Sequence, residues 1–216
     1  MSEQIRRVLV WSGWLRLVHG VLALSTLVLL ATGWLLAGSP ALAEMASFIH
    51  YLAASILLAA LLLRFFLAVA GKGAERFEHL LPRRSEFAAI RASLLFYLSL
   101  GRAPLPNWFA HNPLWKPLYL VLYLLLAMIA LSGWIMPEIQ LVGRLYVPGF
   151  HAWLADVIAG LVIAHLLCVV LQDIKGRSAD ISAMLSGYRF FVFERGTADR
   201  PAAQQVSVKL DDFGGR

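Results

Sequence analysis

Four long apolar runs constrain the fold of this chain more than any other feature of its sequence. They cover about Leu17–Ala37, Met45–Ala70, Leu114–Met136 and Gly149–Gln172. Each is long enough to cross a bilayer, which takes about 20 residues of helix. Lipid admits only helices or closed barrels, and the runs show no strand-like alternation. The sequence therefore predicts an all-α fold, an integral membrane four-helix bundle.

Composition supports a membrane protein and excludes several other classes. Of 216 residues, 60% are hydrophobic and only 15% are charged, against about 25% charged in a soluble domain. Disordered, collagen-like and disulfide-rich chains are excluded by the same values. The single cysteine, Cys168, lies in an apolar run and is expected to be a small packing residue. One thiol cannot build a Cys-rich zinc or iron–sulfur site, and no C-x-x-C-H stretch exists for covalent haem attachment.

Basic residues flank the apolar runs and predict the orientation. The net charge is +6. Apart from Arg64, which lies within the second run, seventeen Lys and Arg residues fall on one side of the predicted membrane and only Arg144 on the other. By the positive-inside rule both termini are cytoplasmic, in a multi-pass protein of the bacterial inner membrane. This placement favours lipid, and not nucleic acid, as the partner of the basic residues.

The runs and their connections suggest one domain followed by a tail. We expect a four-span domain at residues 1–195, with a cytoplasmic loop at 71–113 and a flexible cytoplasmic tail at 196–216. Residues 85–100 predict an amphipathic helix on the cytoplasmic interface. Ala41-Leu42-Ala43 resembles a signal-peptide cleavage site, but the preceding apolar run is too long for one and we expect it to be retained. No internal repeat is evident.

Four of the six histidines, His19, His50, His151 and His165, fall inside the apolar runs. Ionisable groups within a bilayer are costly and point to function. His151 and His165 are fourteen residues apart, which on a helix is about 21 Å of rise and about 40° of rotation. The direction of each span places His19 near the cytoplasm and His50 near the outside. The four therefore sort into an outer pair, His50 with His151, and an inner pair, His19 with His165.

Paired imidazoles across a bundle are the ligands of a six-coordinate haem iron. Zinc needs four ligands at one point, and these two pairs lie too far apart for that. A proton relay would favour carboxylates, yet the spans contain almost none. We therefore expect two non-covalent haem b groups, stacked across the membrane, with these four histidines as the iron ligands.

Several smaller features agree with two haems. Gly33 lies fourteen residues after the first histidine, where a missing side chain would admit the porphyrin edge of the outer haem. Gly133 and Gly160 act in the same way or serve ordinary helix packing. Arg16 and Arg64 lie near the inner haem, where either is suited to bind propionates. For Arg16, snorkelling to the interface is the alternative.

Residues just before the third span are candidates for a quinone site. His111 begins the stretch His111-Asn112-Pro113-Leu114 at the depth expected for the inner haem. Asn112 is able to donate a hydrogen bond to a quinone carbonyl, and His111 to donate or exchange a proton near neutral pH. The alternative for Asn112 is a cap on the third span. His79 is expected on the solvated surface.

At these positions the chain resembles the b-type cytochrome subunits of membrane-bound nickel–iron hydrogenases and the related bacterial cytochrome b561 proteins. The similarity covers about residues 5 to 193. It rests on the four histidines and on these stretches: Arg16-Leu17-Val18-His19, Arg64-Phe65-Phe66 with Gly71 and Pro82, His111-Asn112-Pro113-Leu114, then Asp173, Ser182, Met184 and Gly187-Tyr188-Arg189. The gamma subunit of quinone-reducing formate dehydrogenase is also similar.

The resemblance implies a dihaem subunit that carries electrons between an extracytoplasmic oxidoreductase and the membrane quinone pool. It implies a partner, of hydrogenase type, with an iron–sulfur relay, and a quinone site beside the cytoplasmic haem. The chain shows no catalytic domain, so it is expected to act within a complex and not as an enzyme alone. The alternatives are a free-standing cytochrome b561-type quinone oxidoreductase, the cytochrome subunit of a formate dehydrogenase or thiosulfate reductase, and a haem-free transporter or assembly factor.

Overall fold

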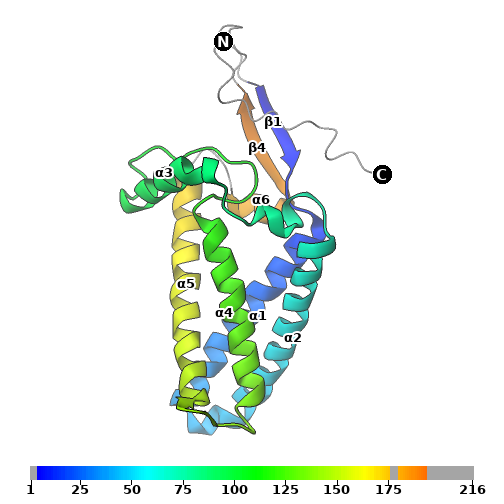
Figure 1. Ribbon diagram of the computed structural model, residues 1–216, viewed down its shortest axis with the longest axis vertical. Helices are drawn as coiled ribbons and strands as arrows, with labels where there is room; N and C mark the ends of the chain where they lie inside the picture. Colours follow the sequence, from blue (N-terminus) through cyan, green and yellow to red (C-terminus); the bar gives the residue numbers. More distant parts are fainter. Residues whose placement is uncertain (1–3, 176–179, 194–216) are drawn as a thin grey trace.

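The computed structural model describes residues 4–175 and 180–193, and within them a bundle of four long helices carries a smaller cap at one end (Figure 1). The predicted tail at 196–216 lies outside the described residues. The helices and strands are β1 (Gln4–Leu9), α1 (Gly13–Gly38), η1 (Pro40–Leu42), α2 (Ala43–Ala70), η2 (Gly73–Glu75), η3 (Phe77–His79), η4 (Arg84–Glu86), α3 (Phe87–Leu98), α4 (Trp115–Ile135), β2 (Leu141–Val142), β3 (Leu145–Tyr146), α5 (Val147–Lys175), α6 (Asp180–Ser186) and β4 (Tyr188–Phe193).

The four predicted spans are confirmed as helices α1, α2, α4 and α5. Each is long and apolar enough to cross a membrane, with η1 continuing into α2. Local signals set their ends. The Ser12 hydroxyl accepts a hydrogen bond from the Leu15 amide at 3.1 Å and caps α1, satisfying one of the free donors of a helix start. Glu44 lies in the first turn of α2, where a negative charge complements the helix dipole.

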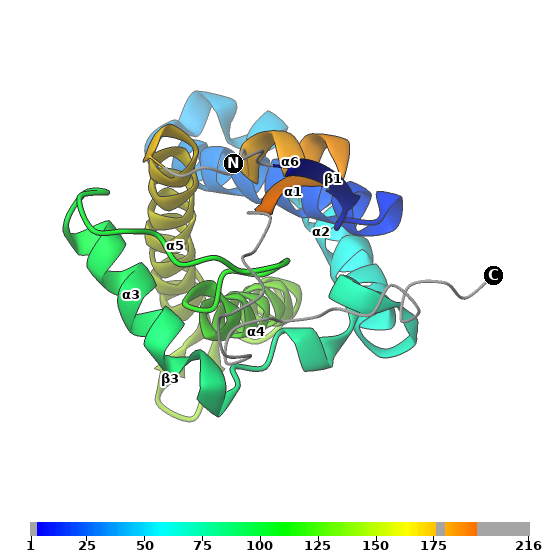
Figure 2. The ribbon, with the colours of Figure 1, turned by 90° about the horizontal axis from the view of Figure 1, so that it is seen from above.

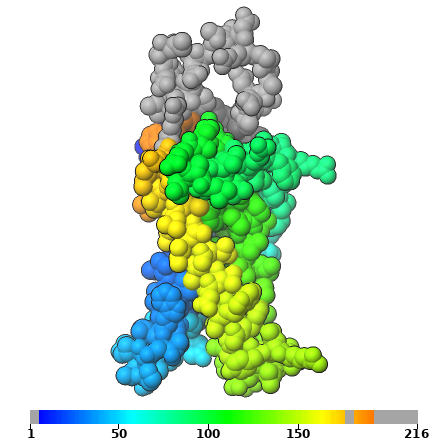
Figure 3. All heavy atoms as spheres, turned by 90° about the vertical axis from the view of Figure 1, so that its left-hand side faces the viewer, coloured from blue at the N-terminus to red at the C-terminus, as the bar shows by residue number. Residues whose placement is uncertain are grey.

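The spans form two helical hairpins. In the first hairpin α1 packs along α2, and in the second α4 packs along α5, with fewer contacts between the hairpins. Seen from above, the four helices surround the axis of the bundle (Figure 2). We call the end with η1, β2 and β3 the loop end, and the end with β1 and β4 the terminal end. At the loop end the tips of the two hairpins stand apart as separate lobes (Figure 3).

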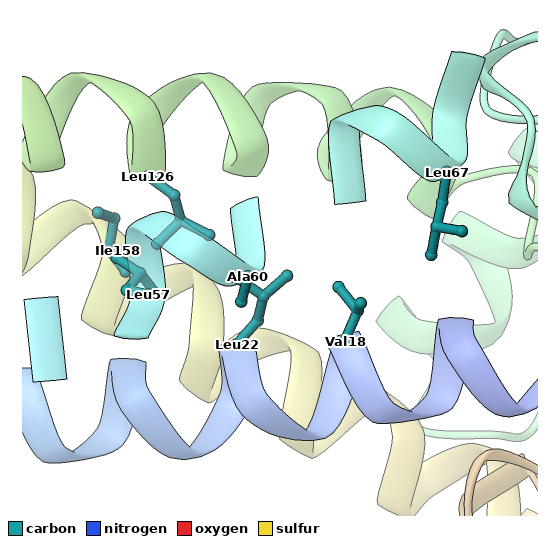
Figure 4. Close-up of a cluster of buried hydrophobic side chains, with 7 residues drawn as sticks. All are labelled: Val18, Leu22, Leu57, Ala60, Leu67, Leu126 and Ile158. Atoms are coloured by element: carbon teal, nitrogen blue, oxygen red, sulfur yellow. The ribbon is translucent and has the colours of Figure 1, made fainter. Parts of the chain in front are cut away.

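The hairpins meet in an apolar layer formed by Leu57 of α2, Leu126 of α4 and Ile158 of α5 (Figure 4). We call these three residues the central layer; all are at most 5% exposed. Ile158 is seven residues from His151 and seven from His165, which corresponds to about 10 Å of helix rise in each direction. The central layer therefore separates the loop-end histidines from the terminal-end histidines.

The central layer yields a stability prediction. Ile158→Ala should lower the free energy of unfolding by about 2–5 kcal/mol, because Ile158 is 1% exposed and truncation leaves a cavity between the hairpins. The matched control on the same helix is Ile163→Ala, since Ile163 is 57% exposed and its loss should stay within about 0.5 kcal/mol. Denaturant unfolding in detergent measures both. Equal losses would show that the hairpins are not held together at this layer.

Short strands make the all-α prediction incomplete, although the fold is mostly helical. β1 pairs with β4 in an antiparallel sheet, from Gln4 opposite Phe193 to Leu9 opposite Tyr188. β2 and β3 form a second, minimal hairpin. Tyr188–Phe193 is rich in residues that favour strands. A contact across the sheet adds to the pairing, because the Arg7 guanidinium lies 3.8 Å from the centre of the Tyr188 ring.

The segment between α2 and α4 covers part of the terminal end. A helix is present within residues 85–100, where an amphipathic helix was predicted: it is α3, preceded by η4. Leu94, Leu95 and Leu98 of α3 are exposed. An ion pair between Lys116 and Glu86 joins the start of α4 to η4. This pair fixes α3 beside the helix that follows it.

Candidate haem and quinone sites

His50 of α2 and His151 of α5 face each other near the loop end. Their ring centres are 6.3 Å apart and the ring planes are inclined by 62°. Two imidazoles bonded to opposite sides of one metal ion have ring centres about 6.3 Å apart, for a metal–nitrogen bond of about 2.0 Å. The loop-end pair, as we name these two histidines, therefore has the separation that one haem iron requires.

Both rings of the loop-end pair are held through Nδ1. His50 Nδ1 lies 2.8 Å from the Thr32 hydroxyl, and His151 Nδ1 lies 2.9 Å from the Ser132 hydroxyl. Nε2 is therefore the nitrogen of each ring that is free to bind a metal. Sequence reasoning missed both hydroxyls, although Thr32 precedes a glycine and a tryptophan in the same order as Ser132 does.

Glycines lie beside both rings. A Cβ atom on Gly133 would come within 3.0 Å of His151 Cε1, and one on Gly33 within 3.9 Å of His50 Cε1. At Gly133 a side chain would force the ring to shift, whereas at Gly33 it would make ordinary contact. Both glycines therefore leave the loop-end rings free of a neighbouring side chain, with the tighter approach at Gly133, and this space suits a flat macrocycle.

His165 of α5 and His19 of α1 form the terminal-end pair. They lie within electrostatic range of each other, and the His19 side chain is exposed. His165 is packed edge-on against Trp115 and Tyr119, with ring centres 5.0 and 6.1 Å away. Within the described residues its Nδ1 is buried and has no hydrogen-bond partner. A half-buried imidazole that has a free ring nitrogen and packs against aromatic side chains is chemically suited to ligate a haem iron.

The histidines are arranged in pairs and not in larger clusters. Over residues 4–175 and 180–193, no three His, Cys, Asp or Glu side chains gather as a metal-ligand set. Each pair has one histidine from each hairpin: α2 and α5 at the loop end, α1 and α5 at the terminal end. A metal bound between the two members of a pair would therefore also join the two hairpins.

The two arginines expected near the terminal-end pair have different surroundings. Arg64 is 4% exposed, and its guanidinium donates to the Tyr123 hydroxyl at 3.2 Å and to the backbone carbonyl of Glu75 at 2.9 Å. Arg16 donates through Nη2 to the Leu185 carbonyl, while its Nε is buried without a partner among the described residues. Arg16 therefore keeps a buried donor free for an anionic group, and Arg64 is largely occupied by the protein.

His111 lies in the loop before α4, between two aromatic rings. Its ring centre is 5.0 Å from that of Trp11 and 6.0 Å from that of Tyr119. Burial, and then the positive charge of Arg64, lowers the pKa of His111 to about 3. In this environment His111 is neutral near pH 7, which favours hydrogen bonding over proton exchange for its role. It remains able to donate one N–H hydrogen bond.

Asn112 is buried and hydrogen-bonded through both ends of its amide. Its Oδ1 accepts from the Leu114 amide at 3.0 Å, and its Nδ2 donates to the Tyr97 hydroxyl at 2.8 Å. The first bond is the local turn expected of an Asn before a helix. Gln172 of α5 also donates to the Tyr97 hydroxyl, and burial raises the pKa of Tyr97 to about 12. Tyr97 therefore keeps its own proton to donate.

Comparison with known proteins agrees with this arrangement. The family described as prokaryotic cytochrome b561 matches residues 10–187 of the chain. A relative from Cupriavidus necator, named a probable Ni/Fe-hydrogenase B-type cytochrome subunit, is 27% identical, with 88% of this chain and 90% of the relative covered. No solved structure gives a significant match.

The family match includes all four apolar helices and all four histidines of the two pairs. Cytochromes of this type use haem b for electron transport within the membrane. The family match covers most of the chain, and four of the described helices are able to span a membrane. The chain therefore belongs to the prokaryotic cytochrome b561 family and is a multi-pass b-type cytochrome.

Proposed function

We propose that this protein is a membrane-anchored dihaem subunit that carries electrons between an extracytoplasmic oxidoreductase and the quinone pool. In this proposal His50 and His151 bind one haem iron, and His19 and His165 bind the other. The observation that carries it is the loop-end pair: its ring centres are 6.3 Å apart, and both Nδ1 atoms lie against hydroxyls.

The chain's own residues would fix how the haems sit and what surrounds them. Bound haem b would supply reversible one-electron chemistry, Fe(III) to Fe(II), which no side chain here offers. The histidines hold the iron, Gly33 and Gly133 leave room beside the rings, and the central layer keeps water out between the two sites. Arg16, with its buried free Nε, is the better candidate to bind a propionate; Arg64 would act through its fixed positive charge.

Orientation follows from the placement of basic residues. We infer that the terminal end is cytoplasmic and the loop end extracytoplasmic, in a bacterial inner membrane, because the described basic residues other than Arg64 and Arg144 lie at or beyond the terminal end. The loop-end pair then lies nearest the extracytoplasmic partner. The name of the Cupriavidus necator relative supports a partner of hydrogenase type. We further propose that an iron–sulfur relay in this partner donates the electrons.

A free-standing quinone oxidoreductase is the competing function, and purification separates the two. Isolation from native membranes in mild detergent, with partners identified by mass spectrometry, should recover a large oxidoreductase with iron–sulfur clusters. Recovery of a formate dehydrogenase or thiosulfate reductase instead would change the partner and keep the role. A chain that purifies alone and reduces quinone from a small diffusible donor would support the free-standing oxidoreductase.

We place the quinone site beside the terminal-end pair, around His111 and Asn112. Two observations support this choice. His111 and His165 share Tyr119 as an aromatic neighbour, so the loop is close to the terminal-end pair. His111 Nδ1 is buried without a partner within the described residues. The remaining amide proton of Asn112 and the hydroxyl proton of Tyr97 are further donors suited to a quinone carbonyl.

Asn112→Ala is expected to abolish quinone reduction while both haems stay bound and reducible by the upstream donor. The change removes the amide donor and also its bond to the Tyr97 hydroxyl, so the site loses one donor and the contact that helps to hold a second. Quinone reduction and inhibition by a quinone analogue are measured in membranes. The control is Asn107→Ala, because Asn107 lies exposed in the same loop. Unchanged quinone reduction and unchanged inhibition in Asn112→Ala would reject the site.

A further inference from the structure

The two hairpins carry the same short motif at the same place. Near the loop end α1 contains Thr32-Gly33-Trp34, and α4 contains Ser132-Gly133-Trp134. Each motif is followed, 18 or 19 residues later, by the loop-end histidine of the next helix. The chain therefore has a short internal repeat, contrary to our expectation of none, and in each copy the hydroxyl residue contacts a histidine.

Each motif hydroxyl already has a partner for its only proton. Thr32 Oγ1 lies 2.8 Å from the carbonyl of Val28, and Ser132 Oγ lies 3.0 Å from that of Ile129. A carbonyl is only an acceptor, so the hydroxyl donates to it and must accept from the imidazole. Nδ1 of both His50 and His151 is therefore the protonated nitrogen, and Nε2 of both carries the lone pair.

We propose that Thr32 and Ser132 are positioning residues of the loop-end haem site. They fix the tautomer of His50 and His151, hold the two ring planes at their mutual angle of 62°, and raise the electron-donating power of both Nε2 atoms. The inference rests on the proposed function, because it takes the loop-end pair as haem ligands. A metal-bound imidazole whose other N–H donates a hydrogen bond is oriented by it and becomes more basic.

His165 of the terminal-end pair differs from both loop-end histidines in this Nδ1 hydrogen bond. Nδ1 of His165 is buried without a partner in the described part of the chain, so it lacks the bond that both loop-end rings have. More basic ligands stabilise Fe(III) over Fe(II). The loop-end haem should therefore have the lower midpoint potential, which favours electron flow from the loop end to the terminal end.

The test compares four variants of the purified, haem-loaded protein. Thr32→Val and Ser132→Ala remove the hydroxyls, whereas Thr32→Ser and Ser132→Thr keep them. In Thr32→Val and Ser132→Ala, the loop-end haem should bind about 10–100-fold more weakly, show a raised midpoint potential and change its low-spin EPR signal. The terminal-end haem should be unaffected. The hydroxyl-retaining variants should resemble the wild type.

Ser25→Ala is the matched control, because the Ser25 hydroxyl donates to the Val21 carbonyl on the same helix and contacts no histidine in the described structure. EPR signals and potentials in Thr32→Val and Ser132→Ala equal to those of Ser25→Ala would overturn the inference. A wild type without haem would instead overturn the proposed function. If the hydroxyl-free variants do not fold, the EPR spectrum of the wild-type loop-end haem still tests the inference. Imidazole planes held at 62° predict a strongly anisotropic low-spin signal. The rhombic signal that parallel planes give would contradict the inference.

Discussion

Replacing His151 with alanine is expected to remove one haem b from the protein and leave the other bound. In the proposed assignment His151 is one of the two ligands at the loop end, and it lies fourteen residues from His165, about 21 Å along α5. Loss of one imidazole should therefore leave the terminal-end site intact. His165→Ala should remove the other haem. Haem content and reduced-minus-oxidised spectra of purified variants measure both losses.

The second member of each pair provides an internal check. His50→Ala should reproduce the spectrum of His151→Ala, and His19→Ala that of His165→Ala. His79→Ala is the control, since His79 lies in η3 outside the spans and its loss should leave both haems in place. Loss of the same haem in His50→Ala and His165→Ala would show that the pairs are assigned wrongly.

The order of the two sites gives the second large expected effect. In vesicles with the loop end outward, a membrane-impermeant reductant added outside should reduce both haems of the wild type. In His50→Ala the remaining haem should stay oxidised, because about 21 Å of helix rise, with the apolar central layer midway, lies between it and the vacated site. In His165→Ala the loop-end haem should be reduced but quinone should not.

A permeant mediator with dithionite is the control in the same vesicles. It should reduce the remaining haem of His50→Ala completely, which shows that the haem is present and redox-active. Reduction of that haem by the impermeant reductant at the wild-type rate would mean that electrons enter without passing the loop end. The proposed direction of transfer would then be wrong.

The membrane-spanning part of the fold was predictable because lipid restricts a spanning backbone to helices or closed barrels. A run such as Met45–Ala70 must form a helix to satisfy its backbone, and α2 begins at Ala43 and ends at Ala70. The depth of each histidine follows from helix rise alone, and His50 and His151 do lie opposite each other. Periodicity and topology were sufficient for these features.

Other features depend on contacts between residues far apart in the chain. The strand β1 was not predicted, because nothing within residues 4–9 indicates its partner at 188–193. The motif hydroxyls were missed for a different reason. Thr32 and Ser132 bond to backbone carbonyls on their own helices, as such residues often do, and only the packing of neighbouring helices brings a histidine to each.

The terminal-end site was the hardest part to predict. His111 was expected to titrate near neutral pH, but the fold buries it between aromatic rings and near Arg64, so its pKa is about 3. Asn112 was expected to cap α4 or to meet a quinone. Its bond to Tyr97 comes from α3, whose docking on the bundle depends on the ion pair between Lys116 and Glu86. No local pattern indicates that docking.

The haem content of the purified wild-type protein tests the central claim most directly. Pyridine haemochrome analysis against protein mass should give close to two haem b per chain if each histidine pair binds one iron, as proposed. Acidified acetone should extract all of it, since no cysteine motif attaches haem covalently. One haem per chain, or haem that resists extraction, would contradict the account.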